Sequence, residues 1–69
     1  MQNPIECLVL KNGKPATYDT VKKILFVADK GFTVFTSKHA ARSAQHHAVE
    51  ADKLAGIVNP HLQYVIEET

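Results

Sequence analysis

An alanine-rich segment at residues 38–55, framed by signals for helix ends, most constrains what this chain can fold into. Ser37 precedes the segment, and a serine there can accept an amide hydrogen bond from the first helical turn. Gly56 follows it, as glycine often does where a helix ends. At 100° per residue the alanines share one face, which consists of Ala40, Ala41, Ala44, Ala48, Ala51 and Ala55. The sequence therefore predicts a helix whose small side chains let it lie close against a sheet.

Two segments that flank this helix show the alternation typical of strands. In residues 32–36, Phe32, Val34 and Thr36 alternate with Thr33 and Phe35. After Asn59-Pro60, residues 62–67 alternate in the same way, with Leu62, Tyr64 and Ile66 on one side. The connection between the two segments is long enough for a parallel crossover, which would be right-handed.

The N-terminal part of the chain predicts a strand that leads into a hairpin. In the segment from Ile5 to Leu10, the side chains of Ile5, Cys7 and Val9 lie on one side of the predicted strand and those of the residues between them on the other. Asn12-Gly13 is a pair favoured in type I′ turns, in which both central residues have positive φ. Pro15 lacks a backbone donor, so we expect an edge strand or a loop there.

Residues 19–30 allow two interpretations. A helix would begin at Asp19 as N-cap and end at Gly31, with an apolar face made of Val21, Ile24, Leu25 and Ala28. A strand at Lys23 to Ala28 would pair with residues 32–36 across a hairpin loop, Asp29-Lys30-Gly31. We favour the strand, because the helix leaves Phe26 and Val27 off its apolar face.

Together these elements predict a single α+β domain over residues 1–69. We expect a small antiparallel-rich sheet of three to four strands with one alanine-rich helix packed on one face, in the order ββαβ or close to it. If residues 19–30 are helical, the arrangement becomes βαβαβ.

Size and composition limit the class of protein. A chain of 69 residues buries only about 60% of the surface that its unfolded form exposes, so oligomerisation would help to stabilise it. Cys7 is the only cysteine, which excludes an internal disulfide and a cysteine-based zinc site. The net charge is +1, and the longest apolar run, Ile24 to Ala28, is far shorter than the roughly 20 residues that span a bilayer. We expect a cytoplasmic protein that does not enter membranes.

The four histidines do not predict a metal site. His39 and His46 are seven residues apart, whereas helical ligands converge at a spacing of three or four. His46 and Glu50 have that spacing but lack a third ligand on the helix, and His61 lies elsewhere. We expect solvated or edge-of-core histidines, with His47 partly buried beside the alanine face.

Catalytic chemistry also lacks a recognisable pattern. Ser37 is placed to cap the helix, and Cys7 lies in a predicted strand, where a free cysteine usually packs as a small apolar residue. Gly13 and Gly31 fit turns, and neither belongs to a phosphate-binding loop. We predict that the protein is not an enzyme and uses no cofactor.

The excess of apolar residues on the predicted sheet gives the best indication of function. One helix can cover only one face of the sheet. An antiparallel sheet with a free face normally carries polar side chains on that face, yet here the side chains on both faces are about half apolar. An exposed apolar patch usually marks an interaction site. We predict a non-catalytic protein-interaction module, an accessory or inhibitor-type factor of the kind common in mobile elements, which acts as a homodimer or on a protein partner. Its interface would contain Leu8, Leu10, Phe35 and Val65.

The alternative is a small nucleic-acid-binding protein. The outward side of the predicted helix carries a stripe of basic or titratable residues, namely Lys38, Arg42, His46 and Lys53. Such a stripe can lie along phosphates. Glu50 and Asp52 interrupt it, which makes this the less favoured hypothesis.

Overall fold

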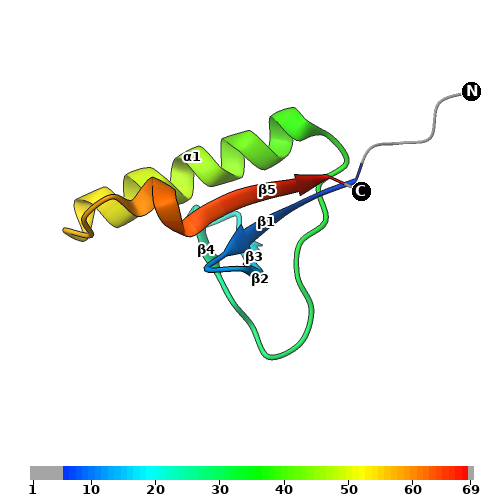
Figure 1. Ribbon diagram of the computed structural model, residues 1–69, viewed down its shortest axis with the longest axis horizontal. Helices are drawn as coiled ribbons and strands as arrows, with labels where there is room; N and C mark the ends of the chain where they lie inside the picture. Colours follow the sequence, from blue (N-terminus) through cyan, green and yellow to red (C-terminus); the bar gives the residue numbers. More distant parts are fainter. Residues whose placement is uncertain (1–5, 69) are drawn as a thin grey trace, which may run out of the picture.

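The computed structural model describes residues 6–68, which form two antiparallel sheets with one helix packed against both (Figure 1). One sheet has the strand order β2-β1-β5 and the other pairs β3 with β4. The elements are β1 Cys7–Lys11, β2 Lys14–Pro15, β3 Thr17–Asp19, β4 Ile24–Phe26, α1 Lys38–Leu54, the 3₁₀ helix η1 Pro60–Gln63, and β5 Tyr64–Glu68. The predicted small α+β fold is confirmed, although its strands are divided between two sheets.

The first hairpin forms where the sequence predicts it. Asn12 and Gly13 have φ values of 53° and 82°, so both central residues of the two-residue loop are in the left-handed region that a type I′ turn requires. Leu10 lies opposite Pro15 in the register that follows. Strand β2 is short and lies at the edge of its sheet. Pro15, which has no amide hydrogen, is tolerated there because an edge strand has no further strand to donate to on its outer side.

Strand β5 pairs with β1 and not with residues 32–36. The pairing is antiparallel, with Val9 opposite Ile66 and Leu10 opposite Val65. The parallel crossover that the length of this connection allowed does not form. Residues 32–36 form no regular strand, and only Phe35 makes a bridge, exchanging two backbone hydrogen bonds of 2.8 Å with Cys7. This bridge and β2 share one edge of β1, which leaves the other edge to β5.

The segment 19–30 contains a turn and a strand. The Asp19 carboxylate accepts the amides of Val21 and Lys22 at 2.9 and 3.0 Å, so its capping chemistry closes a turn and starts no helix. Strand β4 then returns along β3, with Leu25 opposite Tyr18. The strand interpretation is right, but the predicted pairing with residues 32–36 is wrong, and so is the helical alternative.

Residues 31–33 run beside β3, joined to residues 16–18 by one backbone hydrogen bond and two side-chain hydrogen bonds in place of a regular ladder. Gly31 has a φ of 83°, a left-handed conformation that glycine adopts without strain. Thr33 donates its amide to the Ala16 carbonyl at 3.1 Å and accepts the Tyr18 amide on its hydroxyl at 2.8 Å. A side-chain oxygen thus takes the place of one backbone acceptor, which explains why an alternating pattern gives no regular strand here.

Helix α1 begins and ends as predicted. The Ser37 hydroxyl accepts the Ala40 amide at 3.1 Å, and Gly56, with a φ of 84°, donates its amide to the Lys53 carbonyl at 3.0 Å. Ala55 departs from the predicted face, because it is the C-cap and its side chain is exposed. Leu62, predicted within the last strand, lies in η1.

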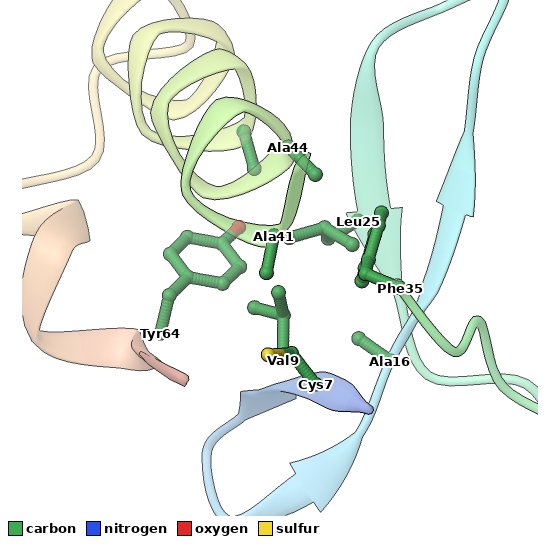
Figure 2. Close-up of a cluster of buried hydrophobic side chains, with 9 residues drawn as sticks. Cys7, Val9, Ala16, Leu25, Phe35, Ala41, Ala44 and Tyr64 are labelled. Carbon is green, nitrogen blue, oxygen red and sulfur yellow. The ribbon is translucent and has the colours of Figure 1, made fainter. Parts of the chain in front are cut away.

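The core lies where α1 meets both sheets. Figure 2 shows Tyr64 and Leu25 on opposite sides of Ala41, with Val9 reaching toward it from β1. The fully buried part of the helix consists of Ala41, Ala44 and Ala48. Because strands on two sides approach these positions, a larger side chain there would push the sheets away from the helix.

We expect Ala44→Leu and Ala48→Leu each to destabilise the protein by about 1–3 kcal/mol, the usual effect of overpacking a core. One kcal/mol lowers the melting temperature of a domain of this size by roughly 4–8 °C. Thermal unfolding followed by circular dichroism measures this, with Ser43→Leu as the matched control, because Ser43 is exposed on the same helix. Leucine variants at positions 44 and 48 as stable as the Ser43 variant would contradict the packing described.

Candidate interaction surfaces

The outer sheet face is the side of β2-β1-β5 that points away from α1. Cys7 and Val9 point into the core, so by alternation Leu8 and Leu10 point outward, and Val65 lies opposite Leu10. Leu8 and Leu10 are half-buried, whereas Val65 is 57% exposed. The structure thus brings three of the four predicted interface residues together on one face.

Phe35, the fourth predicted interface residue, lies elsewhere. It is only 9% exposed and belongs to the core, where its ring centroid is 6.2 Å from that of Tyr18. The prediction for this side chain is wrong, because the bridge to Cys7 turns Phe35 toward the helix. Its neighbours Phe32 and Val34 are about half exposed instead.

The last turn of α1, the following loop and η1 come together at one end of the molecule (Figure 1), and this region carries exposed aliphatic residues. We call it the apolar tip. Leu54, Val58 and Leu62 are 90%, 82% and 72% exposed. With Ile57, which is 40% exposed, they make up the apolar tip.

Sequence reasoning missed this surface. On a helical wheel Leu54 falls at the margin of the alanine face, and Leu62 fits the alternation that leads into β5. From the sequence alone, both residues could therefore be taken as part of the core. The useful signal was available between them, since aliphatic residues at positions 57 and 58 lie among the loop-forming Gly56, Asn59 and Pro60. Aliphatic side chains in a segment that the backbone must keep at the surface indicate an exposed patch.

Backbone hydrogen bonds fix the shape of the apolar tip. Ile57 donates its amide to the Asp52 carbonyl at 3.0 Å, and Leu62 donates to the Asn59 carbonyl at 3.1 Å. Asn59 has a φ of 53°, and the ring of Pro60 is buried. The tip is therefore a defined turn anchored in the domain.

A buried tyrosine joins the same end of α1 to β5. The Tyr64 hydroxyl donates to an Asp52 carboxylate oxygen at 2.6 Å, and the Gln45 amide group donates to the Tyr64 carbonyl at 3.0 Å. Burial raises the pKa of Tyr64 well above its ordinary value, and the adjacent Asp52 carboxylate raises this pKa further. The hydroxyl remains a donor at neutral pH and holds the last turns of the helix against the strand.

The basic stripe is partly neutralised. Lys38 lies 3.0 Å from a Glu68 carboxylate oxygen, and Lys53 lies 3.4 Å from Glu50. Arg42 and His46 are exposed on the same helix. Two of the four residues proposed to contact nucleic acid therefore already have carboxylate partners.

Three of the four histidines are exposed, and His47 is half-buried, as the sequence predicted. His46 and His47 meet edge to face with ring centroids 5.8 Å apart, and His39 and His61 are exposed. Within residues 6–68, no three His, Cys, Asp or Glu side chains lie close enough together to hold a metal ion.

A small hollow lies beside the first hairpin. It has a volume of about 290 Å³ and is lined by Lys11, Asn12, Lys14 and Val27. The Lys11 ammonium group lies 3.5 Å from the Leu25 carbonyl and 5.9 Å from the centroid of the Tyr64 ring. Among the described residues its lining therefore carries two amines, one amide and one aliphatic side chain.

Comparison with protein-family models, curated proteins and solved structures finds no match to this chain. Among the described residues, no helix has both the length and the apolar character needed to cross a membrane. The surfaces described above are therefore the basis for assigning a function.

We expect Tyr64→Phe to lower the free energy of unfolding at neutral pH by about 1 kcal/mol, because it removes the hydrogen bond to Asp52. Above pH ~10 the tyrosine ionises first in the unfolded chain, since its pKa is raised only in the folded protein. The folded state then binds more protons, and stability falls by at most about 1.4 kcal/mol per pH unit from this group.

Urea unfolding between about pH 9 and 11 measures this loss, which Tyr64→Phe should remove. Tyr18→Phe is the matched control, because within the described part of the chain its hydroxyl makes no hydrogen bond. Equal pH dependence in both variants would contradict a special role for the Tyr64 hydroxyl.

Proposed function

We propose that this protein is a non-catalytic protein-interaction module that forms a homodimer through the outer sheet face. The observation that supports this is the row of apolar side chains on the face turned away from α1, formed by Leu8, Leu10 and the exposed Val65. An antiparallel sheet with one face in water normally carries polar side chains there. A second copy that packs on this row would remove it from water.

The energetics allow such a dimer. Burying apolar surface contributes about 25 cal/mol per Å², so a few hundred Å² per copy gives a gross gain of several kcal/mol. Loss of translational and rotational freedom offsets much of this gain, which places the expected affinity near the micromolar range. The interface would be isologous, with the same residues contributed by both copies.

We further propose that the protein works as an accessory or inhibitor-type factor, which acts by covering a surface of another protein. Such a role needs exposed apolar side chains, and the outer sheet face carries them. Cys7 is unpaired and buried, which suits the reducing conditions of the cytoplasm, where we propose that the protein acts.

Nucleic-acid binding is the second candidate, because Arg42 and His46 are exposed on one side of α1. It is less favoured, since the ion pairs of Lys38 and Lys53 would have to break or be shared with phosphates. A few phosphate contacts would make binding steeply dependent on salt.

We expect Val65→Lys to weaken the proposed dimer at least tenfold while the protein stays folded, because it puts a charge in the centre of an apolar contact. Val21→Lys is the matched control, since Val21 is an exposed valine in the turn between β3 and β4, outside the β2-β1-β5 sheet. Light scattering during size-exclusion chromatography, at protein concentrations up to hundreds of micromolar, measures the change.

The same chromatography at two salt concentrations, with and without duplex DNA, separates the two candidate functions. Self-association that is insensitive to salt and unaffected by DNA supports the interaction module. Retention on DNA that disappears at higher salt supports the alternative. A dimer that Val65→Lys leaves intact would contradict the proposed role of the outer sheet face.

A further inference from the structure

We propose that the hollow beside the first hairpin binds a small phosphate monoester, a dianion that two lysine ammonium groups hold between them. The hollow has a volume of about 290 Å³ and is lined by Lys11, Asn12, Lys14 and Val27. The proposed dimer interface contains none of these residues, so ligand binding and dimerisation can be tested separately.

Lys11 occupies a position where the pattern of its strand calls for an apolar side chain. Cys7 and Val9 of β1 are fully buried, and by alternation Lys11 lies on the same inner side of the sheet. Its ammonium group lies 5.9 Å from the centroid of the buried Tyr64 ring and donates to the Leu25 carbonyl at 3.5 Å. An ammonium group has more donors than this one bond uses, so Lys11 keeps donors for a ligand at the edge of the core.

A second lysine lies directly opposite the first. Lys11 and Lys14 are partners in the register of β1 and β2, so their side chains lie on the same side of the hairpin. Like charges that face each other across two strands are destabilising. Within residues 6–68 the ion pairs involve Lys38 and Lys53, and neither lysine of the hollow has a carboxylate partner. An anion in the hollow would therefore relieve a repulsion that the protein itself leaves uncompensated.

The charge of the two lysines indicates which anion fits. Lysine ammonium groups bind phosphate as point charges. A phosphate monoester carries about two negative charges at neutral pH, so it balances both lysines, whereas a monocarboxylate would balance only one. The side-chain amide of Asn12 can donate a further hydrogen bond to a phosphate oxygen.

The size and the remaining wall of the hollow indicate what the phosphate is attached to. A volume of about 290 Å³ lies at the lower end of the range of ligand pockets, roughly 300–1,000 Å³. Such a hollow suits a phosphate group with a short carbon chain, for which Val27 offers an apolar contact. Because Lys14 is exposed, salt screens its attraction for the anion, and we expect a dissociation constant of about 1 mM.

An NMR titration of the isotope-labelled protein at constant ionic strength tests the proposal with three probes, glycerol phosphate, inorganic phosphate and acetate. We expect glycerol phosphate to shift the amide signals of the hollow in a saturable way and to bind more tightly than either other anion. Lys14→Gln should raise its dissociation constant at least tenfold, because one of the two charges is lost. Lys11→Met should do the same, since methionine keeps an unbranched apolar side chain beside the Tyr64 ring without the charge.

Lys22→Gln is the matched control, because Lys22 is an exposed lysine of the β3–β4 turn that does not line the hollow. It changes the net charge equally and should bind as the parent does. Melting temperatures confirm that each variant is folded.

The outcomes separate a specific site from general attraction of anions. Shifts that do not saturate, or equal weakening by Lys22→Gln and Lys14→Gln, would overturn the proposal. Acetate that binds as tightly as glycerol phosphate would overturn the assignment to phosphate, and inorganic phosphate that does so would overturn the assignment to a monoester. Val65→Lys should bind glycerol phosphate like the parent, so failure of the dimer leaves the ligand site intact.

Discussion

The close packing of the alanine face of α1 against two small sheets is the contact on which the rest of the structure depends. Ala41, Ala44 and Ala48 allow the helix to approach both sheets at once, with Val9 on one side and Leu25 on the other. The two-stranded β3-β4 sheet would be marginal in water on its own, and β2-β1-β5 needs a cover for its inner apolar row. A helix with small side chains on its inner face therefore joins the two sheets into a single core.

Because a single helix serves both sheets, some apolar surface stays uncovered and remains available for binding. A helix that serves both sheets covers only their inner faces, so Val65 stays exposed on the outer sheet face. The helix also ends in a turn that carries Leu54 and Val58 into solvent. Its last turns are held by the hydrogen bond between Asp52 and Tyr64, so the core that stabilises the domain also positions the apolar tip. Stability and the proposed interactions thus depend on the same helix.

Local signals predicted local structure well, because they report hydrogen bonds and dihedral angles within a few residues. Ser37 and Asn12-Gly13 each satisfy a requirement of their own turn or cap and were read correctly. Pairing between distant segments was not predictable in this way, since alternation at residues 32–36 does not identify a partner strand. Asp19 shows a related limit, because the same carboxylate can cap a helix or close a turn. The fold class was therefore predictable, whereas the position of Phe35 depended on a tertiary contact, the bridge to Cys7.

Amide hydrogen exchange measured residue by residue tests most directly whether one helix joins the two sheets into a single core. Segments that open together share one free energy of opening, and segments that open separately do not. If the two sheets share one core, the slowest amides of β4, β5 and the Ala44 region of α1 exchange with the same opening free energy, and Ala44→Leu lowers this free energy for all of them together. If β4 exchanges with a clearly lower free energy than β5 in the parent protein, the two sheets do not share a core and the account is contradicted.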